Sequence, residues 1–250
     1  MKIKQIFDYL CDLAPLEKQL SFDNAGFLVG REDREVKKVL LSLDVTADVI
    51  NEAAEGKYEL IISHHPLIFN AIKSVTDEKL LRLVENGIAV ISMHTNLDIT
   101  EGGVNDVLLV LLGAEKDGYL DVEFCGRTGH FNSPLSMPAF LELCREKLHA
   151  NGLRYYDAKR PVENIAVLGG AGSDELEDAI KKGCDTYLTS EIKYHHFLMA
   201  QEYGINLIDG DHFGTEDPVI DMLCQKLSAQ FPDVVFDKSI RHGAVIKFCC

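Results

Sequence analysis

The sequence lacks any long apolar run of the kind that crosses a membrane. No stretch approaches the roughly 18 consecutive apolar residues that a spanning helix requires. The first 13 residues include an apolar stretch broken by Asp8 and Asp12, which is not the pattern of a signal peptide. Their spacing instead predicts an amphipathic helix, with one apolar face formed by Ile3, Ile6, Phe7, Leu10 and Leu13. We therefore expect a cytoplasmic protein without a membrane partner.

Positive charge is also scarce. The chain has 25 Lys and Arg residues against 40 Asp and Glu residues, a net charge of -15 at pH 7. An acidic chain repels the phosphate backbone of nucleic acids, and the sequence has no basic stripe with interleaved aromatic residues. Nucleic acid is therefore disfavoured as a partner. A small anionic substrate would need a counter-charge, which a bound cation can supply.

Paired cysteine motifs, low-complexity tracts, long linkers and solenoid repeats are missing as well. The seven cysteines are odd in number and show no C-x-x-C spacing; they are Cys11, Cys125, Cys144, Cys184, Cys224, Cys249 and Cys250. This usage indicates buried thiols in a reducing compartment and excludes a disulfide framework.

What the sequence does contain is an alternation of strand and helix patterns. In the first half, strand patterns cover 39–43, 59–63 and 88–93, and helical patterns cover 47–55, 77–86 and 103–112. In the second half, strand patterns cover 164–168, 186–189, 206–209 and 234–237, and helical patterns cover 174–182, 194–203 and 216–230. The alternation is typical of βαβ units in a parallel sheet with right-handed crossovers.

Between these stretches the pattern weakens. A short β-like piece at 120–124 lies among glycines, and a helical pattern covers 138–150. We place this middle segment near 125–160. The expected fold class is α/β and two-lobed, with mostly parallel sheets and flanking helices, and with lobes at 1–125 and 126–250.

Side chains that bind metals follow several of the predicted strands. They are His64 and His65 after 59–63, His94 and Asp98 after 88–93, Glu191 after 186–189, and His212 and Glu216 after 206–209. The carboxyl ends of parallel strands lie on one edge of a sheet, where ligand sites form. The sequence therefore predicts a metal site in the cleft at the strand carboxyl ends.

Each motif has a plainer interpretation when it is taken alone. His64 and His65 are compatible with a surface loop, and Asp98 with a helix cap. Glu216 is compatible with a helix start, where the helix dipole favours an acidic residue. Taken together on one predicted edge, the motifs favour a metal site.

The spacing of the candidate ligands suggests two ions. His212 and Glu216 are four residues apart and share a helix face if a helix begins at His212. Neighbours in an extended chain point in opposite directions, so His64 and His65 suit two ions better than one. Asp98 has two oxygens and can bridge ions about 3.5–4 Å apart, as in two-metal hydrolases. Imidazole and carboxylate ligands suit Zn, Fe, Mn or Co without choosing among them.

Two glycine-containing segments and a histidine pair have weaker signals. SFDNAGFLVG at 21–30 is interpreted as a turn before a strand near Phe27. VLGGAGSDEL at 167–176 could hold a phosphate on backbone N–H groups, but it lacks the third glycine of G-x-G-x-x-G and the lysine of a P-loop. A tight turn between strand and helix is therefore favoured. His195 and His196 are interpreted as pocket-lining or structural.

In this order, FDNAGFLVG, SHHPLIF, SMHTNLD, GGAGS, TSEIKYHH and GDHFGTE resemble the GTP cyclohydrolase 1 type 2 homologues, a family of dinuclear metal-binding α/β proteins. The resemblance covers essentially the whole chain. It implies two divalent metal ions per chain, bound by His64, His65, Asp98, His212 and Glu216. It also implies two lobes and a ring-shaped homohexamer, in the short form without an inserted middle domain. Phe22 stands where the family often has Trp.

Two functions follow from these motifs. The first is a metal-dependent hydrolase for a small molecule, either GTP or a related nucleotide, or a phosphoester. In it, Glu191 is the candidate for moving the proton, as a carboxylate at a neighbouring strand end. The alternative is a non-catalytic metal-binding scaffold whose ring is the functional object. Open nitrogen and oxygen sites suit catalysis, whereas closed cysteine sites suit structure.

Overall fold

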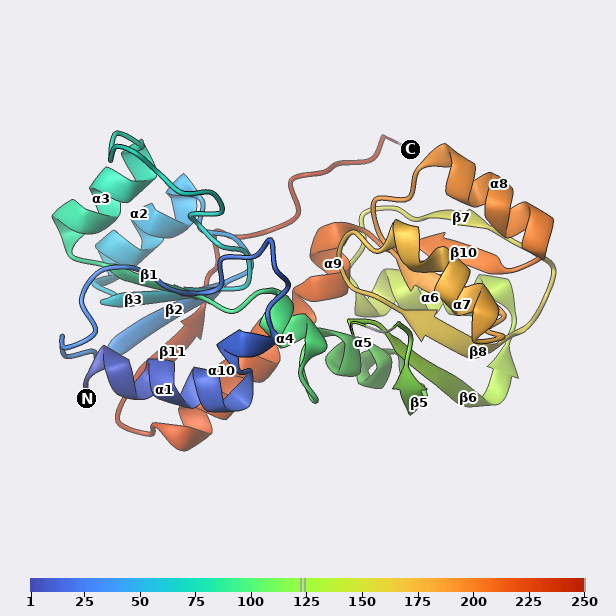
Figure 1. Cartoon of the computed structure of the whole chain (residues 1–250), viewed down its shortest axis with the longest axis horizontal. Coiled ribbons are helices and arrows are strands. Elements are labelled where there is room, and N and C mark those ends of the chain that lie inside the picture. The colour runs from blue at the N-terminus through green and yellow to red at the C-terminus, as the bar shows by residue number, and fades with distance from the viewer. Residues whose placement is uncertain (122, 124, 250) are drawn as a thin grey trace. The chain divides into compact units, whose positions relative to one another are not determined.

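The computed structural model describes residues 1–121, 123 and 125–249, and its described chain divides into two compact units (Figure 1). The first unit comprises Met1–Thr100 and Ile220–Gly243. The second comprises Glu101–Val219 and the chain from Ala244 onward. Two units were expected, with a boundary at 125–126; the observed boundary lies at 100–101, and a C-terminal segment returns to the first unit.

Packing explains this division. Helix α5 (Val104–Leu112) buries Leu108, Leu109 and Leu112 in the core of the second unit, which draws the chain after Thr100 into that unit. Strand β11 (Val235–Lys238) pairs in parallel with β2 (Lys38–Ser42), which returns the C-terminal segment to the first unit. A strand belongs to the sheet that satisfies its backbone hydrogen bonds.

The sheet of the first unit has the order β1-β4-β3-β2-β11. Strands β2, β3 (Leu60–Ser63), β4 (Ala89–Ser92) and β11 are parallel, and β1 (Gly26–Val29) pairs antiparallel with β4. The register aligns Ser42 with Ser63 and Ser63 with Ser92. The carboxyl ends of three neighbouring parallel strands therefore finish at the same level.

Helices cover both faces of this sheet, which explains the continuous apolar runs of its central strands. Figure 1 shows α2 (Ala47–Gly56) and α3 (Glu78–Asn86) on one side, and α1 (Ile3–Leu13) and α10 (Pro218–Gln230) on the other. The side chains of Leu40, Ile61 and Val90 pack against α2 and α3. The connections hold the 3-10 turn Leu16–Lys18 and the short helix α4 (Thr95–Ile99).

The sheet of the second unit has the order β5-β6-β8-β9-β10-β7. Strands β8 (Val162–Val167), β9 (Thr186–Thr189) and β10 (Asn206–Asp209) are parallel. Antiparallel pairs flank them, formed by β5 (Glu115–Tyr119), β6 (Arg127–Leu135) and β7 (Arg154–Tyr156). This sheet is mixed: its three neighbouring strands β8, β9 and β10 are parallel, and antiparallel pairs lie on either side of them.

The middle segment predicted near 125–160 is part of this sheet and not a separate region. Strand β6 lies between β5 and β8, and β7 pairs with β10. A short connection from β5 to β6 allows only antiparallel pairing, since a parallel pair needs a long crossover. The β-like piece predicted at 120–124 includes residues 122 and 124, which lie outside the described residues.

Alternation along β8 divides the core of the second unit between two faces. Ile165 and Val167 pack with α5 and α6 (Met137–Lys147), while Ala166 and Leu168 pack with α7 (Leu176–Lys181) and α8 (Tyr194–Tyr203). The 3-10 turn Ser173–Glu175 precedes α7, and α9 (His212–Glu216) precedes α10. The expected α/β class is confirmed as a mixed α/β fold with two sheets flanked by helices.

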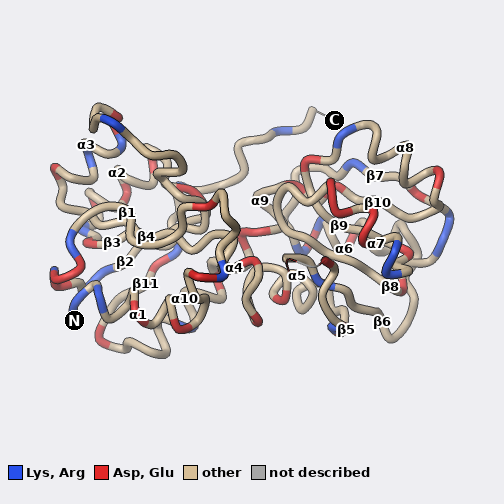
Figure 2. Tube along the Cα trace, viewed as in Figure 1, with Lys and Arg blue, Asp and Glu red and all other residues tan. Residues whose placement is uncertain are grey.

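Charged residues of both signs are spread over each unit, with acidic ones beside many basic ones, as in the Lys4–Asp8 pair (Figure 2). Burial raises the pKa of the Cys144 thiol to about 12 and that of Cys184 to about 11, so both are inert buried thiols. Within the described part of the chain, no helix is long and apolar enough to cross a membrane.

Candidate metal centre

The chain turns sharply where β3 ends, and buried hydroxyl groups hold this turn. The hydroxyl oxygens of Ser63 and Ser92 lie 2.8 Å apart, and Ser63 Oγ donates to the carbonyl of His65 at 2.8 Å. Ser92 Oγ donates to the same carbonyl at 3.2 Å. The side chain of His64 is fully buried and that of His65 is 24% exposed. The strand ends therefore place two adjacent histidines in a defined orientation.

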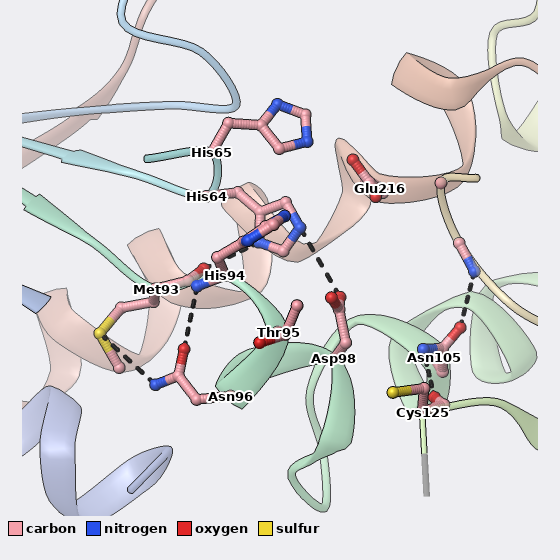
Figure 3. Close-up of polar contacts among 12 residues, drawn as sticks. His64, His65, Met93, His94, Thr95, Asn96, Asp98, Asn105, Cys125 and Glu216 are labelled. Atoms are coloured by element: carbon pink, nitrogen blue, oxygen red, sulfur yellow. Dashed lines mark hydrogen bonds and ion pairs between the residues drawn. The ribbon is translucent and has the colours of Figure 1, made fainter. Parts of the chain in front are cut away.

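A third histidine, His94, follows β4 and completes a cluster. Its ring centroid lies 5.1 Å from that of His64 and 5.6 Å from that of His65, and the rings of His64 and His65 are 5.0 Å apart. Among the described residues, one nitrogen from each ring lies within 4.8 Å of the others, so these histidines can hold a metal ion. Figure 3 shows the three rings together at the ends of β3 and β4.

Each of these rings is oriented by a hydrogen bond at Nδ1. The acceptors are Met93 O for His64, Asp44 Oδ1 for His65 and Asp23 Oδ1 for His94, each at 2.8 Å. A carbonyl and two carboxylates only accept, so Nδ1 carries the proton in each neutral ring. The tautomer that results leaves a lone pair on Nε2 of each ring, which can bind a metal or accept a hydrogen bond, as in metal sites whose histidines are oriented by outer carboxylates and carbonyls.

Asp98 stands in α4, near the same cluster. Its Oδ1 lies 3.6 Å from Nε2 of His64, which is beyond a hydrogen bond but suits two ligand atoms of one ion. Asp98 is not a helix cap, because it lies inside α4. The backbone N–H of Gly102, after α4, donates to Asp106 Oδ2 instead. Figure 3 draws the contact between His64 and Asp98.

Asp23 is a carboxylate held by four hydrogen bonds beside this cluster. Its Oδ1 accepts from His94 Nδ1 and from the backbone N–H of Asn24, and its Oδ2 accepts from the N–H and hydroxyl of Thr95. Burial would raise the pKa of Asp23, but the hydrogen bonds from His94 and Thr95 lower it to about 2. Asp23 is therefore ionised, and it fixes His94 at the start of α4.

Sequence reasoning missed Asp23 and Asp44. The segment 21–30 was interpreted only as a turn before a strand. That strand, β1, is present at Gly26–Val29, but the role of Asp23 in the turn was not predicted. Asp44 follows the strand predicted at 39–43 directly, just as His64 follows 59–63. Its position at a strand end was the available signal.

The second unit holds its own pair of candidate ligand atoms. His212 begins α9, which follows β10, and its Nε2 lies 3.1 Å from Oε2 of Glu216 one turn later. Nδ1 of His212 donates to Oε1 of Glu191, which follows β9, at 2.6 Å. The predicted helix start at His212 is thus present. Glu191 orients His212 in the way that Asp44 orients His65.

The glycine-rich segment after β8 packs directly against this pair. Gly170 has a φ of +70°, and a Cβ placed there would lie 2.1 Å from Oε1 of Glu216 and 3.3 Å from Nε2 of His212. Its N–H donates to Oγ1 of Thr215 at 3.0 Å, and its carbonyl accepts from the Ser190 hydroxyl at 2.6 Å. The segment is a tight turn that leaves room for the two ligand side chains.

Two residues beside the pair have strained backbones. Glu191 and Asp211 have φ values of 54° and 69°. These values lie in the left-handed region, which residues other than glycine rarely adopt. Such strain concentrates at functional sites, where the surrounding structure imposes it. His195 and His196 lie farther along, on α8, where Nε2 of the buried His196 is 3.4 Å from Asp174.

The donor atoms present suit a divalent transition metal. Imidazole nitrogens and carboxylate oxygens are ligands for Zn, Fe, Mn and Co, and each unit presents both types. Gly170, which has no side chain, allows Glu216 and His212 to pack closely against the backbone of the turn. The residues therefore fit a metal, without fixing its identity or the number of ions.

A family model described as Duf34/NIF3 (NGG1p interacting factor 3) matches residues 1–242. The chain belongs to this family. A GTP cyclohydrolase 1 type 2 homolog from Clostridium perfringens is 34% identical over 249 residues, covering 94% of this chain and 95% of the relative. The resemblance to the GTP cyclohydrolase 1 type 2 homologues is therefore confirmed.

Solved structures of similar proteins carry the same Duf34/NIF3 fold. The crystal structure of a Staphylococcus aureus hypothetical protein matches with a TM-score of 0.90 and 27% identity, covering 100% of this chain and 99% of that one. Reduced HcgD from Methanocaldococcus jannaschii matches with a TM-score of 0.85 and 31% identity, covering 95% and 97%. The topology of both units is thus that of a Duf34/NIF3 protein.

Proposed function

We propose that this chain is a dinuclear metal-dependent hydrolase acting on a nucleotide or a related heterocycle, with GTP as the first substrate to test. Two divalent ions would be held by His64, His65, Asp98, His212 and Glu216. The observation that supports this most is the shared orientation of the histidines. Nδ1 of His64, His65 and His212 each faces an acceptor, and this is the arrangement of metal-ligating histidines.

The ligand chemistry supports catalysis over a purely structural ion. Structural zinc sites are closed and rich in cysteine, whereas the proposed ligands are imidazoles and carboxylates. A pair of divalent ions supplies Lewis acidity and lowers the pKa of bound water toward neutrality. For a GTP-like substrate, the reaction would be hydrolytic opening of the purine ring at C8. The names of the curated relatives support a nucleotide of this kind.

The side chains around the ligands have separate roles in this proposal. Glu191 holds His212 in one orientation, because its Oε1 accepts from Nδ1. As a 59% exposed carboxylate, Glu191 is also our candidate for moving a proton at its second oxygen. Asp44 and Asp23 position His65 and His94 from outside the cluster.

The test combines metal analysis with substrate profiling. Purified protein reconstituted separately with Zn, Fe, Mn and Co is analysed for metal content and assayed against GTP, other nucleotides and phosphoesters. We expect two ions per chain and turnover that His64→Ala abolishes. Absence of metal after reconstitution contradicts the proposal. Full metal content without any turnover would favour the alternative, a non-catalytic scaffold.

We also propose a homohexamer, which the family resemblance implies. The resemblance alone carries this proposal, because Leu135, Met137, Phe140, Leu141 and Leu143 pack in or against the core of the second unit. Repulsion between acidic copies should weaken the ring at low salt. Light scattering coupled to gel filtration is expected to give six chains at moderate salt; a monomer peak at every salt and protein concentration contradicts the ring.

A further inference from the structure

Two large aromatic side chains lie exposed together in the first unit. Phe22 is 60% exposed and Phe69 is 44% exposed, and their ring centroids are 6.2 Å apart with an angle of 37° between the planes. They come from segments far apart in the sequence, the loop before β1 and the loop after β3. Single exposed apolar residues are common, but two neighbouring rings present a continuous apolar surface to solvent.

This pair continues into the histidine cluster. The ring of Phe69 lies 6.4 Å from that of His94, edge to face at 76°, and His94 lies 5.1 Å from His64. A row of rings therefore runs from Phe22 through Phe69 to the proposed metal ligands. A molecule that rests on Phe22 and Phe69 would have one end beside His94.

Polar contacts hold the two loops in place. The amide of Asn24 donates to the carbonyl of Ile68 at 2.6 Å, which ties the residue after Asp23 to the residue before Phe69. Asp23 in turn accepts a hydrogen bond from Nδ1 of His94. Nε2 of His94 is therefore the hydrogen-bond acceptor of that ring. The loops are linked to each other and to His94, so the rings are positioned by built contacts.

A pocket of about 260 Å³ also lies against Phe69, lined by residues that include Ile68, Asn70, Ile72 and Leu80. Exposed Ile72 adds apolar surface next to it. The loop after β3 thus offers room beside Phe69 as well as an exposed apolar ring.

We propose that Phe22 and Phe69 form a stacking platform for the planar heterocyclic ring of the substrate, with His94 Nε2 accepting a hydrogen bond from a ring or exocyclic N–H of the base. This inference rests on the proposed function and specifies the substrate class. Three features carry it: the two exposed rings, their continuity with His94, and the tautomer that Asp23 imposes. A planar heterocycle can stack on the two rings and donate an N–H to His94. Stacking on aromatic side chains tolerates any base.

The chain contains no tryptophan, which gives a direct test. Phe22→Trp introduces a single tryptophan into the platform, whose emission can be excited apart from that of the eight tyrosines. The metal-loaded variant is titrated with guanosine, adenosine and cytidine, and with ribose as a ligand without a base. We expect saturable quenching by the nucleosides and none by ribose. Adding Phe69→Ala should weaken nucleoside binding roughly 10-fold, the effect of losing one stacking ring.

Tyr203→Trp is the matched control, because Tyr203 is also 60% exposed and lies on α8 of the second unit, outside the platform. Its fluorescence should fall only linearly with nucleoside concentration, by collision. The same linear response in Phe22→Trp would overturn the platform. So would loss of oligomer in Phe69→Ala by light scattering together with unchanged nucleoside response, which would make the surface an interface between copies.

Metal content measured in the same samples separates this inference from the proposed function. Saturable quenching in a protein that holds no metal would support the platform and contradict the metal-dependent hydrolase. Two bound ions with no saturable response to any nucleoside would leave the metal proposal standing and overturn the platform.

Discussion

In the first unit, three histidine rings are held by a carbonyl and two carboxylates, whereas in the second unit one histidine and one glutamate stand on a short helix. The first cluster rests on buried strand ends joined by serine hydroxyls. The second depends on a glycine that leaves room and on left-handed residues at Glu191 and Asp211. Hydrogen bonds at Nδ1 orient the histidines of both sets, and the second set depends in addition on backbone conformation.

If this contrast is correct, the largest effect comes from Gly170→Ala. The added Cβ would meet Oε1 of Glu216 at 2.1 Å and would also sit at a φ of +70°. We expect the second unit to lose its ligand geometry, with a marked fall in metal content and in Tm. Elemental analysis and thermal unfolding measure both.

Gly204→Ala is the matched control for this change. Gly204 has a φ of +64°, but a Cβ there would have nothing within 4 Å. It should cost only the left-handed backbone strain, about 1–2 kcal/mol, and leave metal content unchanged. Equal losses of metal and stability in the two variants would show that the space beside Glu216 is unimportant.

The next effect compares a proposed ligand with an orienting carboxylate. Asp98→Ala removes a proposed ligand of the first unit, whereas Glu191→Ala removes only the acceptor that orients His212. Loss of an outer partner typically weakens metal binding about 10–100-fold, and loss of a direct ligand should weaken it more. Competition against a chelator gives both affinities. If Glu191→Ala empties the protein while Asp98→Ala stays loaded, the two roles are reversed.

The smallest effect is a pH dependence in the first unit. Asp23 has a folded pKa of about 2, below its ordinary 3.8. A lowered pKa means that the folded state favours the ionised carboxylate, so the stabilisation is present above about pH 4 and is lost as pH falls toward 2. Its size is at most about 2 kcal/mol.

Urea unfolding between pH 5 and 2.5 should therefore show a steeper loss of stability in the wild type than in Asp23→Asn. Asp77→Asn is the control, because Asp77 accepts only backbone N–H groups at the start of α3. Identical slopes in the wild type and Asp23→Asn would mean that Asp23 is not the group being protonated.

Parts of the second unit were predictable to the residue. The strands at 186–189 and 206–209 and the helix at 194–203 have the predicted bounds. Each of these strands has an apolar pair between two polar residues, Tyr187–Leu188 or Leu207–Ile208, and Gly204 ends α8 in a left-handed conformation. Strands β5 and β6 were missed, because charged and half-exposed residues along them leave no continuous apolar run.

The sequence by itself determined which side chains follow which strands: His64 and His65 after β3, His94 after β4, and His212 after β10. This was readable because parallel strands finish at a common edge, so position in the chain predicts position at that edge. The tertiary structure alone decided what orients these rings. Asp23 and His94 are 71 residues apart in the sequence, and Gly170 and Glu216 follow different strands, β8 and β10. Neither contact leaves a local pattern in the sequence. Hydrogen bonds and close approaches depend on distance in space, which only the packed sheets establish.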